Sequence, residues 1–309
     1  VSVPRISVFA RLANGDMGPI RFIGGQATKL SRTMHGIAYD AVHDEIIVPV
    51  ALAGAILVFR GGASGDEPPI QVIQGPHTQL DRPHTVAVDP LHGEIMVGDR
   101  SGRGVLVFPL RANGDVAPIR TISGDKTGLV DITGVGVDPI HNLIVVSSSS
   151  EIEGGKTGLF IFNRMANGNV TPKAVIAGPK TGIIRPWQLA IDSAQGKIFA
   201  ALVNNLYFAP YTLAKPRTGL NPNVQIPMGW AENNGGPGFI GVWKITDNGD
   251  VPPRAVIKGM ATYLVHPAGV AIDPSEGEVF ATDSVRNGLF TFRVPQFFKP
   301  FTQILDAPH

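Results

Sequence analysis

The sequence contains no cysteine, which excludes disulfide bonds, thiolate metal sites and cysteine nucleophiles together. It also lacks an excess of either charge, because 26 Lys and Arg residues nearly balance 25 Asp and Glu residues. Net charge therefore gives no indication of a nucleic-acid partner. No apolar run reaches the roughly 18 residues that a membrane-spanning helix needs. We expect neither a nucleic-acid partner nor a transmembrane segment.

The absence of cysteine fits a Gram-negative periplasm or the cell exterior, although a cytosolic chain can lack cysteine too. The sequence begins Val1-Ser2-Val3, without an initiating Met. We take this as the sign of a processed terminus from which a signal peptide has been removed. The expected location is therefore secreted or periplasmic.

Glycine and proline are plentiful, with 37 and 26 residues, as a chain made of short strands and turns requires. The stretch from Val86 to Gly124 is restated by four other stretches. Its predicted strands are 85–88, 94–98, 104–108 and 118–122. Asn113-Gly114 closes the last hairpin, because both central residues of such a turn need positive φ. A four-stranded meander repeated at a fixed period is typical of a β-propeller blade. We predict an all-β propeller that occupies residues 1–309 as one domain.

The sequence is compatible with two numbers of blades. Third strands begin near residues 6, 55, 104, 158, 240 and 288, whereas first and second strands occur five times each. Either a sixth blade is split between the chain ends, or five blades close with an N-terminal strand locking the last. We favour six blades, with the ring closed by pairing of Arg5–Ile23 with strands from Gly269 onward. Alternatively, the segment Pro295–His309 or a neighbouring subunit covers the strand edge that an incomplete blade leaves unpaired.

One interval is lengthened by an insertion at residues 205–239, which carries Tyr207, Tyr211 and Trp230. A loop of this length inside a compact repeat is usually functional or disordered, and its aromatic residues argue against disorder. These three side chains are candidate contacts for a protein partner. The alternative is an irregular excursion that packs on its own blade.

Propeller geometry brings the loops before the first strands, and those between second and third strands, to one face. The polar and aromatic residues predicted to line a ligand site on this face are His35, His84, Asp99, Arg100, Trp187, Asn204, His266 and Asp283.

His35 and His84 occupy equivalent positions in successive repeats, so we expect them to be neighbours. Imidazoles at a channel mouth could bind a divalent metal ion or act as general acid and base. They could equally line a polar ligand pocket, or hydrogen-bond buried backbone groups where a strand begins. The sequence leaves these three interpretations open.

A second histidine series, His43, His92 and His141, has a strict 49-residue spacing and lies in the turn between first and second strands. Repeated turn geometry explains this spacing, and we expect solvated side chains here.

Asp89-Pro90 and its equivalents resemble catalytic carboxylates only in isolation, since Asp caps its own turn and Pro fixes φ. We assign these residues a structural role.

The repeat resembles the NHL type of propeller unit. Val86–Asp89, Ile95–Asp99 and Val105–Phe108 carry the resemblance, and residues 269–292 restate it. Propellers of this kind include binding modules, gluconolactonase-like calcium enzymes and the streptogramin lyase, which uses histidine and acidic residues at the channel mouth. The resemblance therefore implies the fold and leaves several functions open.

The leading hypothesis is a secreted binding or assembly module that presents a loop face to a protein partner or small ligand. It follows from the aromatic insertion and from the lack of a complete, repeated catalytic constellation. The alternative is a metal-dependent hydrolase or lyase, resembling a lactonase, with a divalent ion near His35 and His84. Fold alone does not decide between them.

Overall fold

A computed structural model describes residues 4–102, 104–150, 154–203 and 238–301. These residues form four four-stranded sheets, one three-stranded sheet and one two-stranded sheet. The sheets are the antiparallel blades of a β-propeller, as the repeat predicts. Contacts divide the chain into two compact units, Val1–Val146 with Ile161–Lys173 and Ser147–Phe160 with Ala174–His309.

The N-terminal hairpin consists of β1 (Ile6–Val8) and β2 (Arg21–Ile23). The first blade contains β3 (Ala38–Asp40), β4 (Glu45–Val50), β5 (Ala55–Arg60) and β6 (Gln71–Gln74). The second contains β7 (Pro83–Asp89), β8 (Glu94–Asp99), β9 (Gly104–Pro109) and β10 (Arg120–Ser123). The third contains β11 (Asp131–Asp138), β12 (Leu143–Ser149), β13 (Gly158–Asn163) and β14 (Ala174–Ile176).

The fourth blade contains β15 (Arg185–Asp192), β16 (Lys197–Val203), β17 (Phe239–Lys244) and β18 (Ala255–Ile257). The fifth contains β19 (Pro267–Asp273), β20 (Glu278–Asp283) and β21 (Gly288–Arg293). Helical structure in the described residues is limited to short 3₁₀ turns: η1 (Ala51–Ala53), η2 (Pro76–Thr78), η3 (Asp125–Thr127), η4 (Pro179–Thr181), η6 (Met260–Thr262) and η7 (Pro295–Phe298). None of these described helices is long and apolar enough to cross a membrane.

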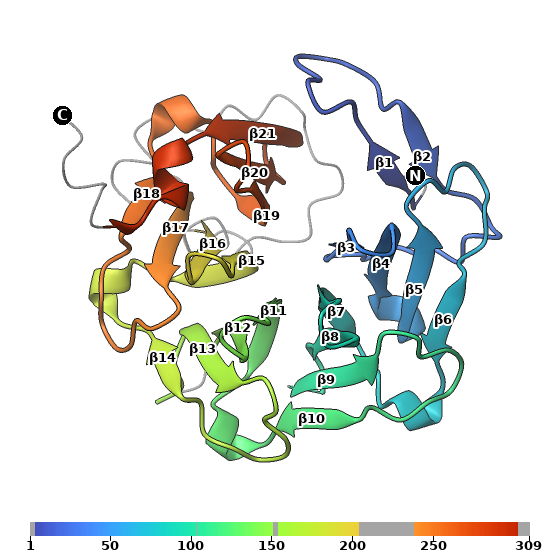
Figure 1. Cartoon of the computed structure of the whole chain (residues 1–309), viewed down its shortest axis with the longest axis horizontal. Helices are drawn as coiled ribbons and strands as arrows, with labels where there is room; N and C mark the ends of the chain where they lie inside the picture. The colour runs from blue at the N-terminus through green and yellow to red at the C-terminus, as the bar shows by residue number, and fades with distance from the viewer. Residues whose placement is uncertain (1–3, 103, 151–153, 204–237, 302–309) are drawn as a thin grey trace, which may run out of the picture. The chain divides into compact units, whose positions relative to one another are not determined.

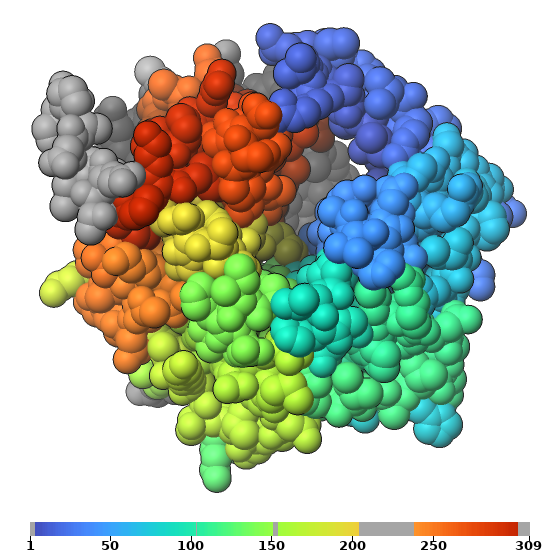
Figure 2. Space-filling model, viewed as in Figure 1, coloured from blue at the N-terminus to red at the C-terminus, as the bar shows by residue number. Residues whose placement is uncertain are grey.

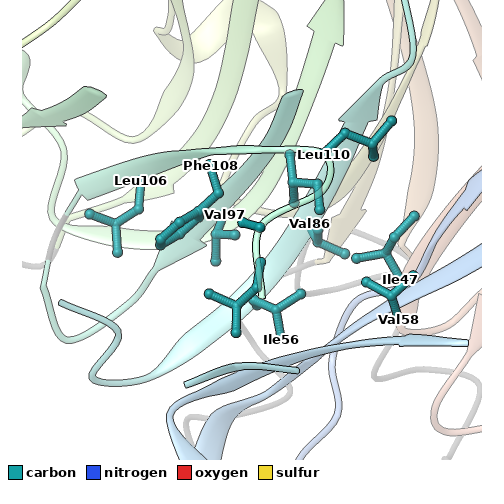
Figure 3. Packing of buried hydrophobic residues seen from close by; sticks show 11 residues of the cluster. Ile47, Ile56, Val58, Val86, Val97, Leu106, Phe108 and Leu110 are labelled. Atoms are coloured by element: carbon teal, nitrogen blue, oxygen red, sulfur yellow. The ribbon is translucent and has the colours of Figure 1, made fainter. Parts of the chain in front are cut away.

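Blades of the first unit stack through their faces. The first strands β3, β7 and β11 lie side by side, with β6 and β10 on the opposite side of their blades (Figure 1). Figure 3 shows Ile47 and Ile56 of the first blade packed with Val86, Val97 and Phe108 of the second. Both faces of a central strand are covered in this way, so every residue of β4 and of β8 is buried. This burial explains the near-continuous apolar runs in the sequence.

Each turn between third and fourth strands also reaches back to the preceding blade. The Gly114 amide donates to the Val72 carbonyl at 2.7 Å, and the Gln74 amide donates to the Gly114 carbonyl at 3.1 Å. The side-chain carbonyl of Asn113 accepts from the Val72 amide at 2.9 Å. We call this set of bonds the turn latch. It recurs at Asn167 in the first unit, whose side chain accepts from Thr121.

The second unit repeats the latch, since Asn248 accepts from the Val175 amide at 3.0 Å. A glycine follows each of these asparagines with φ near +80°, a conformation that disfavours other residues. Sequence reasoning identified Asn113-Gly114 as a hairpin turn. The structure adds that this turn and its equivalents hold successive blades together.

The N-terminal hairpin joins the first blade through the same kind of bond. The Gly65 amide donates to the Phe22 carbonyl at 2.7 Å, and the Gly24 amide donates to the Gly65 carbonyl at 2.9 Å. In the space-filling view the dark blue hairpin lies against the lighter blue first blade (Figure 2). Ile23 is fully buried at this junction. The hairpin therefore takes the place of a blade that precedes the first.

The structure corrects the favoured blade number. Five sheets possess first and second strands, so the propeller has five blades, the alternative number. The N-terminal strands β1 and β2 pair with each other as a separate two-stranded sheet. They therefore do not supply a complete sixth blade within the described residues. Closure of the ring by the N-terminal strands, and a single domain over residues 1–309, stay predictions.

The chain after β21 covers the apolar surface of the fourth blade. Phe297 is buried, and the ring of Phe298 stacks on that of Phe199 with 5.3 Å between centroids. Lys197 is also buried, and its Nζ donates to the Phe297 carbonyl at 2.7 Å and lies 4.3 Å from the centre of the Phe301 ring. Phe301 does not belong to a strand, and residues 302–309 lie outside the described residues.

Removal of a latch side chain should weaken the fold measurably. We expect Asn113→Ala to lower the free energy of unfolding by about 1 kcal/mol, because the Val72 amide loses its side-chain acceptor. Asn14→Ala is the matched control, since Asn14 begins the equivalent turn of the N-terminal hairpin and its side chain makes no latch bond among the described residues. Urea denaturation of both variants tests the expectation, and equal losses would contradict it.

Candidate functional site

Two histidines predicted to be neighbours stack on each other in the first unit. The rings of His35 and His84 have centroids 4.3 Å apart and an interplanar angle of 14°. His84, in β7, is 1% exposed, whereas His35, in the loop before β3, is exposed. The main chain of Thr133, in β11, hydrogen-bonds the His84 ring. The buried imidazole thus supports the strand beside it and forms the base on which His35 lies.

Arg100 supplies the positive charge beside this stack. It follows β8, and its Nη2 donates to Asp131 Oδ2 at 2.7 Å while its Nε bonds the other carboxylate oxygen. Burial lowers the pKa of His84 to about 3, with the charges of His35 and Arg100 acting in the same direction. Burial of one ring face and the charge of Arg100 also lower the pKa of His35. Both imidazoles are therefore neutral at pH 7.

The stacked geometry does not suit a metal ion shared by the two histidines. The lone pair of an imidazole nitrogen lies in the ring plane, and an ion would have to lie about 2 Å from a nitrogen of each ring. Because the two imidazole rings are stacked and nearly parallel, their in-plane lone pairs do not point at one common position. Among the described residues, no group of three His, Cys, Asp or Glu side chains could hold an ion. The structure offers no coordination set for the metal hypothesis in this part of the chain.

Two predicted site carboxylates are occupied in holding loops. Asp99 is buried and accepts from the amides of Asp81 at 2.8 Å, Arg82 at 3.0 Å and Gly102 at 2.7 Å. Its bonds join the loop before β7 to the loop after β8. These contacts fix the loop that carries Arg100, so Asp99 positions the site and its oxygens are already satisfied.

Asp283 has the same role in the second unit. Its carboxylate accepts from the amides of Val265, His266 and Arg286 at 2.7, 2.6 and 2.9 Å. At these distances the backbone amides already satisfy the carboxylate oxygens as hydrogen-bond acceptors. Asp283 therefore supports the loops before β19 and after β20, and a ligand contact at this residue stays a prediction.

The second unit has its own aromatic–imidazole pair. The rings of Trp187 and His266 meet edge to face with centroids 5.6 Å apart. His266 Nδ1 lies 2.8 Å from the Ser284 hydroxyl, and the Trp187 carbonyl accepts from the Ser147 hydroxyl at 2.5 Å. Burial lowers the pKa of His266. The structure thus brings these two predicted site residues together, and adds Ser147 and Ser284.

The remaining predicted residues fall outside the described part of the chain. They are Asn204 and the three aromatic residues of the insertion, Tyr207, Tyr211 and Trp230.

Sequence reasoning missed the acidic partner of Arg100. Asp131 opens β11, and the position that precedes a first strand carries other residue types in the other repeats. The available signal was an opposite charge in the loop of the following blade that lies on the same face. Ser284 likewise follows Asp283 directly and could have been found as a polar neighbour of His266.

The second histidine series has the structural role expected for it, although its side chains are bonded as well as solvated. His43, His92 and His141 place Nδ1 at 2.6, 2.7 and 2.8 Å from the second carboxylate oxygen of the aspartate three residues earlier. Each aspartate is fully buried and caps the turn. The strict spacing therefore reflects a turn motif.

Comparison with known proteins adds information on the fold. No family model and no curated protein matches the chain. Among solved structures, a chain in the crystal structure of a nidogen/laminin complex is similar, with a TM-score of 0.54 and 12% sequence identity over 96% of this chain and 93% of that chain. The shared fold is the β-propeller. At this identity the likeness carries no further conclusion.

The lowered pKa of His84 predicts a loss of stability on acidification. Its folded value, about 3, is below the ordinary value near 6.5, so between these values the unfolded chain binds a proton that the folded chain does not. The free energy of unfolding should therefore fall as pH falls from 6.5 toward 4.5, by about 1.4 kcal/mol per pH unit for this histidine.

Urea denaturation at several pH values tests this in the parent protein and in His84→Gln. The variant should lose most of that slope, while His35 and His266, whose pKa values are also lowered, retain a smaller one. An unchanged slope in the variant would show that His84 is protonated in the folded protein.

Proposed function

We propose that this protein is a binding module whose loop face around His35 and Arg100 accepts a carboxylate, such as an acidic side chain of a protein partner. One observation carries the proposal. Arg100 uses Nε and Nη2 on Asp131, while Nη1 makes no hydrogen bond within the described residues, and the side chain remains 32% exposed. A guanidinium N–H beside an exposed neutral imidazole suits a carboxylate acceptor.

The rigid placement of His35 and of the loop before Arg100 supports this function. His35 rests on a buried ring, and Asp99 fixes the loop before Arg100 by bonds at 2.7 to 3.0 Å. A site held in advance loses less conformational entropy on binding. Within the described residues the stack has no set of ligands for a metal ion, which favours a binding role over the metal-dependent hydrolase or lyase.

We also propose that the protein is an NHL-type propeller located in the periplasm or outside the cell, with a role in assembly. The NHL-type sequence pattern supports membership of that class of propeller, and the absence of cysteine supports a location in the periplasm or outside the cell. An assembly role is supported by the breadth of the loop face that a propeller presents. The similar chain belongs to a structure of a protein complex, which agrees with a binding role without indicating a partner.

NMR titration of the His35 side chain tests the site with a defined probe, acetyl-Glu-Glu-Glu-amide. A bound carboxylate stabilises the imidazolium, so the pKa of His35 should rise and its ring signals should shift saturably. The uncharged acetyl-Gln-Gln-Gln-amide should leave both unchanged. Fractionation of cells that express the full-length gene would test the location separately.

Two arginine variants make the test specific. Arg100→Gln should abolish the shift, because it removes the proposed donor. Arg82→Gln removes the same charge from an exposed side chain in the neighbouring loop and should preserve the response. Equal responses to the Glu and Gln peptides, or equal losses in both variants, would overturn the proposal.

A further inference from the structure

The fifth blade ends with a strand edge that no described strand covers. Its sheet has the order β19-β20-β21, whereas the other four blades have a fourth strand beyond the third. Within the described residues, β21 thus pairs on one side alone, with β20. An edge of this kind presents a row of backbone donors and acceptors to any extended chain.

The other blades show what covers a third strand at this position. In β6, β10, β14 and β18 an Ile-x-Gly sequence ends the fourth strand, at Ile73, Ile122, Ile176 and Ile257. Ile73 pairs with Ile56, Ile122 with Val105 and Ile257 with Ile240, in each case the second residue of the third strand. The first three of these isoleucines are fully buried and Ile257 is 6% exposed. The corresponding residue of β21 is Leu289.

Side chains on one face of β21 are exposed. Leu289 is 54% exposed, whereas its counterpart Val105 in β9 is fully buried. Thr291 is exposed as well, whereas its counterpart Val107 is buried. Exposure alternates along the whole strand, with Leu289, Thr291 and Arg293 on the open face. An apolar side chain and a strand edge are therefore available together.

The backbone of Thr291 faces this open edge. In the second blade the Val107 carbonyl accepts from the Ile119 amide at 2.8 Å, on the side of the fourth strand. The amide and carbonyl of one residue point to the same side of an antiparallel strand. Thr291 occupies the same place in β21, so its N–H and C=O both point away from β20.

The strand has none of the usual protection of an exposed edge. Proteins block such edges with proline, bulges or inward-pointing charges. The six residues of β21 contain no proline and one charge, at Arg293, and their pairing with β20 is regular. The chain that follows turns into η7 and packs on Phe199 of the fourth blade. The described continuation of the chain therefore does not cover β21.

We propose that β21 binds an extended segment of a partner protein by strand addition, and that this segment carries an Ile-x-Gly sequence whose isoleucine lies opposite Leu289. The four complete blades define the occupant, because each shows the register, the buried isoleucine and the glycine that ends the strand. A second copy of this chain is a poorer donor, since its own strands of this type, β2 included, already pair within its sheets. The inference goes beyond the proposed carboxylate site and does not depend on it.

A synthetic peptide with the sequence of residues 117–124, which includes β10, is the probe. Fluorescence anisotropy of the labelled peptide with the full chain should show saturable binding at one site per chain. Aspartate in place of the isoleucine should weaken binding by at least about tenfold, since a carboxylate would enter an apolar position. Failure of the unmodified peptide to bind at millimolar protein would overturn the inference.

Two protein variants test the edge. Thr291→Pro removes an outward N–H and leaves the ladder to β20 in place, so binding should be lost. Thr291→Val is the matched control and should bind as the parent does. Circular dichroism establishes that both fold, and retained binding in a folded Thr291→Pro variant would contradict strand addition.

Cysteine cross-linking gives a readout that does not depend on the proline variant. The chain has no cysteine of its own, so Leu289→Cys creates a single thiol. A peptide with cysteine at the isoleucine position should form a disulfide with this variant but not with Phe290→Cys, because a shift of one residue moves the side chain to the other face. The reverse preference would overturn the proposed register.

Light scattering distinguishes a second copy as the occupant. A concentration-dependent dimer that Thr291→Pro dissociates, and that the peptide does not displace, would overturn the partner-strand inference in favour of self-association. Because Arg100 is intact in every variant, the carboxylate titration can fail or succeed independently of these outcomes.

Discussion

The structure depends on backbone hydrogen bonds that cross from one blade to the next. Apolar faces alone attract neighbouring sheets but set no unique offset between them, because the hydrophobic effect is not directional. The turn latch supplies that direction, since Gly114 exchanges bonds of 2.7 and 3.1 Å with the outer strand of the preceding blade. Without a fixed offset, the loops before the first strands would not present His35 and His84 at contact distance.

Repetition in this sequence means different things at different positions. His43, His92 and His141 repeat because a buried aspartate three residues earlier needs a donor. His35 and His84 occupy equivalent positions in only two repeats, and they lie against Arg100 and each other. The first series stabilises turns of the fold, whereas His35 and His84 form part of the candidate site. A residue that breaks the repeat is therefore the better guide to function here.

Strand positions could be predicted because turns and apolar runs are local. The expected 94–98 and 104–108 appear as β8 and β9, each one residue longer. The number of blades could not be predicted in the same way. It depends on whether β1 finds a first and second strand to join, which is a long-range pairing that no local pattern encodes. The six third strands in the sequence therefore favoured one blade too many.

The candidate site shows the same division between local and long-range information. Equivalent positions in successive repeats correctly placed His35 and His84 as neighbours. Their mutual orientation depends on side-chain torsions and on packing around β7, so the stack that disfavours a shared ion was not accessible from the sequence. The pairing of Arg100 with Asp131 likewise joins the ends of two blades across 31 residues of sequence.

Stacking and charge state are linked in this site. Two imidazolium rings 4.3 Å apart beside a guanidinium would place three like charges together, so close stacking requires neutral rings. Asp131 offsets the charge of Arg100 through two hydrogen bonds and thereby lets the stack stay near it. Acidification acts first on exposed His35, because its outer face is open to water whereas His84 is buried. A bound carboxylate would oppose the same repulsion, so proton uptake and carboxylate binding at this face favour each other.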